Sequence, residues 1–168
     1  SIHNALLSLV EEGDEVIIPA LTVIMDAYAV IHNGGIPVFA DVDEKTHLIT
    51  ADEIEKKMTP KTKAIITVAW DGISCDMKTI MALAKKYNLQ VIDDCARSML
   101  FSYKGRLVGT IADISVFSFE SKKHLSAGGE GGMLVSNDAP LAINARQFAG
   151  IGYKHMTADA VRTHLAID

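Results

Sequence analysis

The chain has 168 residues, of which 49% are hydrophobic and 22% are charged, and its mean hydropathy is +0.21. This composition predicts a globular domain with a large core rather than a disordered chain. The net charge is −5 and the sequence has no basic run of five or more residues, which argues against a nucleic-acid or anionic-membrane surface. No apolar run approaches the ~20 residues of a membrane span.

The two cysteines, Cys75 and Cys95, form neither a metal-ligand pattern nor a disulfide framework. We therefore expect no metal site and a reducing, cytoplasmic setting. The chain begins at Ser1, in what reads as the middle of an amphipathic helix, without a basic region followed by a signal-type apolar core. This start predicts a fragment or a processed chain.

Apolar runs of strand length alternate with segments of helical period along the chain. A strand is predicted at 15–20, followed by a helix over 22–33 with Thr22 as its N-cap. The next strand is predicted at 36–43. A short helix follows over 50–58, where Thr50 and Glu53 have the spacing of a capping box.

The second half of the chain continues the alternation. Its predicted elements are strand 63–70, helix 76–87, strand 89–96, a small hairpin around Lys104-Gly105, strands 114–120 and 131–138, and helix 139–149. Strand 63–70 shows no polar alternation, so both of its faces should be covered. The sequence therefore predicts an α/β domain with a mainly parallel sheet.

Ligands of such sheets bind at the carboxyl ends of the strands. The polar or aromatic residues that follow those ends are Trp70, Asp71, Asp94, Arg97, Ser118, Lys122 and Lys123. Asp94 permits three interpretations: a carboxylate that holds a protonated pyridine nitrogen, a Mg²⁺ ligand together with Asp93, or a local helix or loop cap. The spacing alone does not decide among them.

Lys122 and Lys123 follow strand 114–120 and precede the segment GGEGG. A lysine in this position can form a Schiff base with an aldehyde cofactor, although adjacent lysines are more often solvated. Ser118 can donate a hydrogen bond to a phosphate, or it can have a purely structural role. The glycines of GGEGG allow either a close approach to a ligand or a tight connection between strands.

Five segments together resemble the DegT/DnrJ/EryC1/StrS family of sugar aminotransferases, which depend on pyridoxal phosphate (PLP). They are GDEVIIPALT, GGIPVFADVD, TPKTKAIITVAWDGISCDM, VIDDCA and YKGRLVGTIADISVFSFESKKHLSAGGEGGMLVSND, and the resemblance covers roughly residues 2–150. It implies the large domain of fold type I, a three-layer αβα arrangement around a seven-stranded mixed sheet.

The resemblance also implies roles for individual residues. Lys123 matches the lysine that forms the Schiff base with PLP, Asp94 the partner of the pyridine nitrogen, and Ser118 a contact of the cofactor phosphate. Val23 stands where many members place an aromatic ring. Arg97 replaces a glutamine or histidine that positions the cofactor near its ring hydroxyl.

The resemblance further implies that residues 1–150 form an incomplete PLP-binding domain, and that residues 151–168 begin the connection to a C-terminal small domain. The family's phosphate loop is expected to precede Ser1. The implied reaction transfers an amino group from an amino acid, usually glutamate, to a keto-sugar that is most often nucleotide-linked, in a homodimer. Two alternatives stay open: an inert fragment of such an enzyme, and a PLP-dependent sugar dehydratase, which would carry histidine in place of the lysine.

Overall fold

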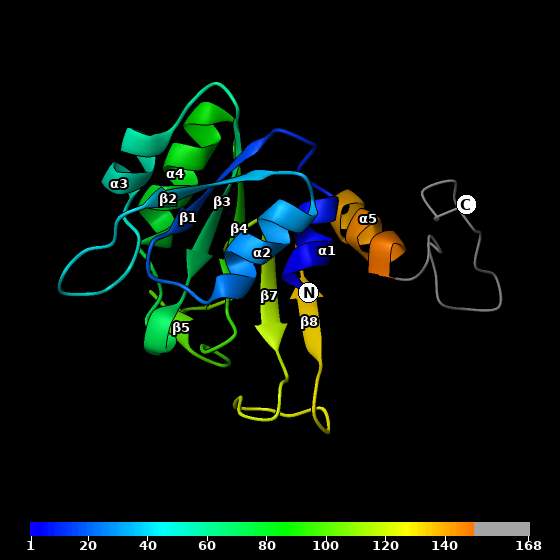
Figure 1. Ribbon diagram of the computed structural model, residues 1–168. Helices are drawn as coiled ribbons and strands as arrows, with labels where there is room; N and C mark the ends of the chain where they lie inside the picture. The colour runs from blue at the N-terminus through cyan, green and yellow to red at the C-terminus, as the bar shows by residue number, and fades with distance from the viewer. Residues whose placement is uncertain (150–168) are drawn as a thin grey trace.

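A six-stranded sheet forms the centre of the molecule in the computed structural model, which describes residues 1–149. The strand order is β2-β1-β3-β4-β7-β8. The strands are β1 (Glu15–Pro19), β2 (Ile36–Ala40), β3 (Thr62–Val68), β4 (Gln90–Asp94), β7 (Ile114–Ser118) and β8 (Gly132–Val135). The first five are parallel, and β8 pairs antiparallel with β7 (Figure 1). The predicted mainly parallel sheet is confirmed.

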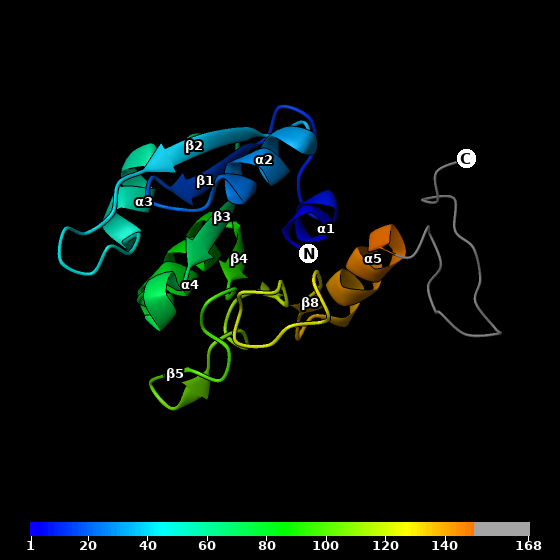
Figure 2. The same ribbon diagram turned by 60° about the horizontal axis from the view of Figure 1, so that its bottom comes forward.

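Helices cover both faces of the sheet (Figure 2). One face packs against α1 (Ile2–Leu7), α2 (Ile24–His32) and α5 (Ala139–Ala149), and the other against α3 (Ala51–Lys57) and α4 (Met77–Tyr87). The arrangement is therefore the three-layer αβα fold that the resemblance implies, although the sheet has six strands within the described residues rather than the seven of the family.

The central strands are buried on both faces, as predicted for β3. In β1, Val16 and Ile18 face the α1 side while Ile17 faces the α3 side, because successive side chains of a strand alternate. In β3, Ile66 and Ile65 alternate in the same way, and all five side chains have 0% exposure. Apolar burial of this kind is the main stabilising contribution to such a fold.

Several predicted strands end earlier than expected. β2 stops at Ala40, where its parallel pairing with β1 ends, and Val42 instead forms an isolated antiparallel bridge with Ile49. The Asp41 carboxylate accepts a hydrogen bond from the Val42 N–H at 2.8 Å. β3 stops at Val68 and is followed by a single 3₁₀ turn, Trp70–Gly72. The hairpin is confirmed: β5 (Ser102–Tyr103) pairs with β6 (Arg106–Leu107), and both central residues, Lys104 and Gly105, have positive φ.

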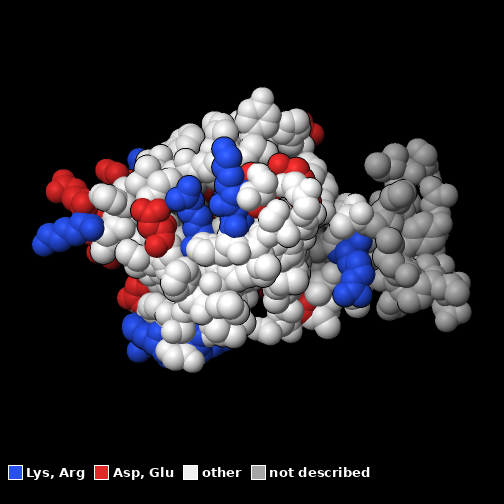
Figure 3. All heavy atoms as spheres, turned by 90° about the horizontal axis from the view of Figure 1, so that it is seen from below, with Lys and Arg blue, Asp and Glu red and all other residues white. Residues whose placement is uncertain are grey.

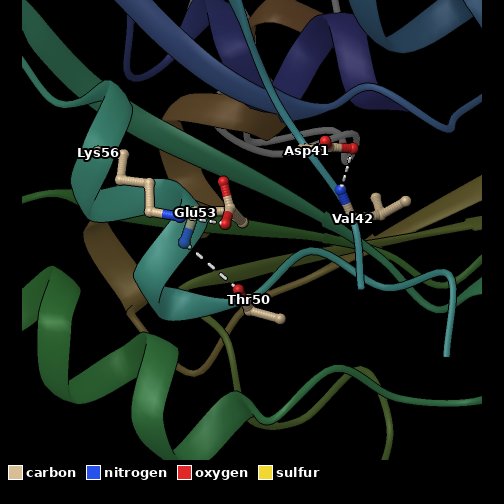
Figure 4. Close-up of polar contacts among 5 residues, drawn as sticks. All are labelled: Asp41, Val42, Thr50, Glu53 and Lys56. Atoms are coloured by element: carbon tan, nitrogen blue, oxygen red, sulfur yellow. Dashed lines mark hydrogen bonds and ion pairs between the residues drawn. The ribbon is translucent and has the colours of Figure 1, made fainter. Parts of the chain in front are cut away.

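The predicted cap of α3 is confirmed. The Thr50 Oγ1 accepts a hydrogen bond from the Glu53 N–H at 3.3 Å (Figure 4). The Glu53 side chain does not complete a capping box within the described residues; instead it forms an ion pair with Lys56 on the next turn (Figure 4).

The predicted cap of α2 is wrong. Its N-cap is Val23, whose side chain offers no hydrogen-bond acceptor, and the helix begins at Ile24. The Thr22 hydroxyl instead donates to the carboxylate of Asp26. The Thr22 hydroxyl thus interacts with the Asp26 side chain and not, as the sequence pattern predicts, with a backbone N–H at the start of the helix.

Two expectations fall outside the described residues, namely the boundary between residues 150 and 151 and the connection over 151–168. Within the described part of the chain, no helix is long and apolar enough to cross a membrane.

Thr50→Ala should destabilise the protein by about 1 kcal/mol, because the Glu53 N–H loses its acceptor at the start of α3. Thr50→Ser keeps the hydroxyl and is the control. Urea unfolding measures the difference, and an equal loss in both variants would show that the hydroxyl does not stabilise the helix.

Gly109→Ala should be more harmful than Gly105→Ala, although both glycines have positive φ. Alanine at either position costs about 1–2 kcal/mol for the left-handed backbone. A Cβ at Gly109 would also press on the Phe117 ring, 2.9 Å from its Cε2, whereas a Cβ at Gly105 meets nothing within 4 Å. Overpacking should add about 1–3 kcal/mol at Gly109 alone. Equal free energies of unfolding for the two variants would contradict this reading.

Candidate active site

The carboxyl ends of β3, β4 and β7 lie at one edge of the sheet, where the loop 119–131 connects β7 to β8 (Figure 1). A view from below shows basic side chains near the middle of the visible face, with acidic ones beside them (Figure 3). Two cavities with four lining residues in common lie here, with volumes of about 240 and 480 Å³. The shared residues are Val23, Asp94, Ala96 and Lys123.

The structure brings all five predicted site residues to these cavities. Val23, Asp94 and Lys123 line both, Arg97 lines the smaller cavity, and Ser118 lines the larger. They come from the start of α2, the ends of β4 and β7, and the two loops that follow those strands. Their individual roles stay predictions.

Asp94 is the last residue of β4 and is 7% exposed. Its Oδ1 accepts a hydrogen bond from the Ala96 N–H at 2.8 Å. Burial raises the pKa of Asp94, while that hydrogen bond and the Lys123 ammonium counteract the rise. Asp94 is thus a buried carboxyl that faces a cavity and is held by its own backbone.

The neighbouring acid, Asp93, does a different job. Its carboxylate accepts hydrogen bonds from the Thr67 hydroxyl (2.8 Å) and the Cys95 thiol (3.2 Å), and burial raises its pKa to about 6. Neither cavity is lined by Asp93. Residues 1–149 hold no group of three side chains suited to a metal ion, so the interpretation of the acid pair as a Mg²⁺ site finds no support there.

The loop after β7 separates the two adjacent lysines. Lys123 is half-buried and lines both cavities, whereas Lys122 is exposed and reaches only an outer cavity of about 540 Å³. The loop is closed by hydrogen bonds from the Phe119 N–H to the Gly131 carbonyl (2.7 Å) and from the Ala127 N–H to the Phe119 carbonyl (2.9 Å). The glycine segment therefore serves as a tight return to β8.

Ser118 ends β7 beside the same loop. Its hydroxyl oxygen accepts a weak hydrogen bond from the Glu120 N–H at 3.4 Å. Because a hydroxyl both accepts and donates, the Ser118 hydrogen can still be given to a ligand in the cavity.

Arg97 and Trp70 form the wall toward solvent. The Arg97 guanidinium pairs with the Asp71 carboxylate at 3.3 Å, and its central carbon lies 6.0 Å from the centre of the Trp70 ring. Both charged side chains are largely exposed, so this pair adds little stability. Val23, 47% exposed, presents an aliphatic surface to both cavities.

One site residue was missed by the sequence reasoning. Asp26 lies inside α2, is 1% exposed and lines the larger cavity. Burial and the nearby Asp94 carboxylate raise its pKa to about 7. The sequence places Asp26 next to Ala27 and four residues before Val30, and both of these are buried in the structure. The sequence pattern alone does not show that this face of the helix points toward the cavity.

The donor set fits the predicted cofactor. A primary amine, a carboxylate and a hydroxyl meet at one cavity, which matches an aldehyde, a basic ring nitrogen and a phosphate. The smaller cavity has apolar side chains from Val23, Val68, Ala69 and Trp70, which suit the faces of a flat aromatic ring.

Known proteins resemble this chain over most of its length. The GDP-perosamine synthase of Escherichia coli O157:H7 is 47% identical over 153 residues, which are 90% of this chain and 42% of that protein. The UDP-N-acetyl-3-dehydro-alpha-D-glucosamine 3-aminotransferase of Acidithiobacillus ferrooxidans is 49% identical over 129 residues, 77% of this chain and 35% of that protein.

A solved structure agrees with the fold. NtdA of Bacillus subtilis, with its bound cofactor PMP, superposes with a TM-score of 0.87 at 33% identity, over 94% of this chain and 36% of that one. The chain thus spans less than half the length of the relatives it matches. The profile of the DegT/DnrJ/EryC1/StrS aminotransferase family matches residues 1–166, and the chain belongs to this family.

Proposed function

We propose that the chain is the PLP-binding part of an enzyme that transfers an amino group from an amino acid to a keto-sugar. The observation that carries the proposal is the meeting of Lys123, Asp94 and Ser118 at one cavity. The names of the relatives, a perosamine synthase and a sugar 3-aminotransferase, support a sugar as the acceptor.

Bound PLP supplies an electron-withdrawing ring, which stabilises the negative charge left when a carbon next to the amine loses its proton. The Nζ of Lys123 would hold the cofactor covalently and would move the proton at the reacting carbon. The buried Asp94 carboxylate would accept a hydrogen bond from the ring nitrogen and keep that nitrogen protonated. The Ser118 hydroxyl would donate to the phosphate.

The finer points of the proposal concern substrates and assembly. Glutamate is proposed as the donor and a nucleotide-linked keto-sugar as the acceptor; the word GDP in the name of one relative supports the nucleotide. The outer cavity would receive the substrate, and it is lined by Asp71, Arg97, Phe101, Glu120, Lys122, Lys123 and His124. We propose a homodimer in the cytoplasm for the whole protein.

Lys123→Ala should abolish the visible absorbance that develops when PLP is added to the chain. Lys122→Ala is the matched control and should keep the absorbance, because Lys122 lines neither of the two inner cavities. Borohydride followed by peptide mass spectrometry should place the reduced cofactor on Lys123. Labelling of Lys122, or no labelling at saturating PLP, would overturn the assignment; the second result would identify this chain as an inert fragment.

Ser118→Ala should weaken PLP binding about 10- to 100-fold, since a hydrogen bond to a charged group contributes about 1.5–3 kcal/mol. Ser121→Ala is the control, because Ser121 is exposed and donates to Glu120. Absorbance titrations should be repeated with pyridoxal, which lacks the phosphate. If Ser118→Ala weakens pyridoxal binding equally, the hydroxyl does not act on the phosphate.

A further inference from the structure

The buried carboxyl of Asp26 is not explained by the reaction proposed above. It lies in α2, whose other inward-facing side chains include Ala27, Ala29 and Val30. An ionised carboxylate in such a place is costly unless it is paired. Asp26 has no cationic partner among the described residues, so another arrangement must hold it.

The contacts of Asp26 leave one oxygen open. Its Oδ2 accepts a hydrogen bond from the Thr22 hydroxyl, while its Oδ1 is buried without a partner in residues 1–149. The Asp94 carboxyl is its charged neighbour, and both acids line the larger cavity. The open oxygen is thus available to the Asp94 side or to a ligand.

Two adjacent carboxyls in a buried site cannot both ionise at little cost, so one of them keeps its proton. The surroundings of Asp26 and Asp94 differ, and this difference decides which carboxyl keeps the proton. Asp94 receives the Ala96 N–H and faces the Lys123 ammonium, and both favour its charged form. Asp26 has only the Thr22 hydroxyl, so the proton stays on Asp26.

We propose that Asp26 is a positioning residue, whose protonated carboxyl donates a hydrogen bond to the Asp94 carboxylate. The two acids then act as one unit with a single negative charge. Glu120 and Glu130 line the same cavity, but Glu120 is only half-buried and Glu130 is exposed, so neither takes the buried place of Asp26.

The meaning of this pair rests on the proposed function, in which Asp94 meets the ring nitrogen of PLP. While Asp26 donates to Asp94, it draws off part of the negative charge available to that nitrogen. When Asp26 loses its proton, that charge is restored and a second one is added. Asp26 would therefore set how strongly the ring nitrogen holds its proton, as a function of pH.

The decisive experiment observes the carboxyl groups of the whole 168-residue chain without PLP. Carbon-13 NMR of the aspartate carboxyls should show one group that titrates near pH 7 and disappears in Asp26→Asn. The Asp94 signal, assigned with Asp94→Asn, should shift at the same pH in the wild type and not in Asp26→Asn. Titration of Asp26 near its ordinary pKa, or an Asp94 signal that ignores it, would overturn the proposal.

A second variant guards against loss of structure in Asp26→Asn. Thr22→Val removes the hydroxyl that stabilises the charged form, so the titration of Asp26 should move to higher pH. Thr46→Val is the control, since the Thr46 hydroxyl donates to Asp43 at the surface. It should alter the Asp43 signal and leave that of Asp26 unchanged. An unchanged Asp26 titration in Thr22→Val would contradict the geometry.

Stability gives an independent readout. The pKa of Asp26 in the folded chain, about 7, lies above its ordinary 3.8, so the folded chain binds this proton more tightly than the unfolded one. Its contribution to stability is therefore present below the ordinary pKa and is lost as the pH rises toward 7. Asp26→Asn should flatten the dependence of the unfolding free energy on pH between about pH 4 and 7. An unchanged slope in this variant would argue against a buried proton on Asp26.

The carboxyl titration and the test of PLP binding can fail independently of each other. If the chain binds no PLP, the proposed function fails while the carboxyl titration still decides whether the pair exists. If PLP binds, its absorbance should change at the pH where Asp26 titrates and should lose that change in Asp26→Asn. Bound PLP with no such inflection would overturn the positioning role.

Discussion

The fold depends on a constraint of its sheet: the central parallel strands are covered by helices on both faces, which leaves their ends as the place for polar groups. Asp94 and Ser118 are the last residues of their strands, and Lys123 follows in the loop. The apolar interior holds the strands in register, and the register in turn fixes where these groups meet. The packing of the core thus determines where the polar groups at this edge of the sheet lie.

A second physical theme is that three buried acids, two that line the larger cavity and one that lines neither cavity, have different hydrogen-bond partners. Asp93 is satisfied by a hydroxyl and a thiol, Asp94 by a backbone N–H and an ammonium, and Asp26 by a hydroxyl alone. Burial raises the pKa of each acid, and the hydrogen bonds from these partners counteract the rise to a degree that depends on the partner. The sequence alone does not show this difference between Asp93 and Asp94, because the side chains of neighbouring residues in a strand point to opposite faces of the sheet.

Much of the fold could be predicted, because strand-length apolar runs and the cap at Thr50 are local signals. Asp94, Ser118 and Lys123 could be placed at one edge because parallel topology gathers strand ends. The start of α2 could not, since the choice of Thr22 between backbone and Asp26 depends on tertiary packing. Asp26 escaped notice for the same reason: its importance comes from Asp94, which is 68 positions away in the sequence and adjacent in space.

The antiparallel direction of β8 has a mechanical consequence. The segment with Lys123 leaves β7 and returns at once to the neighbouring strand, and its base is tied by the Phe119–Gly131 and Ala127–Phe119 hydrogen bonds. The base of this loop is therefore fixed at both ends. If the base stays in place, Lys123 changes its reach chiefly by rotations along the four methylene groups of its own side chain.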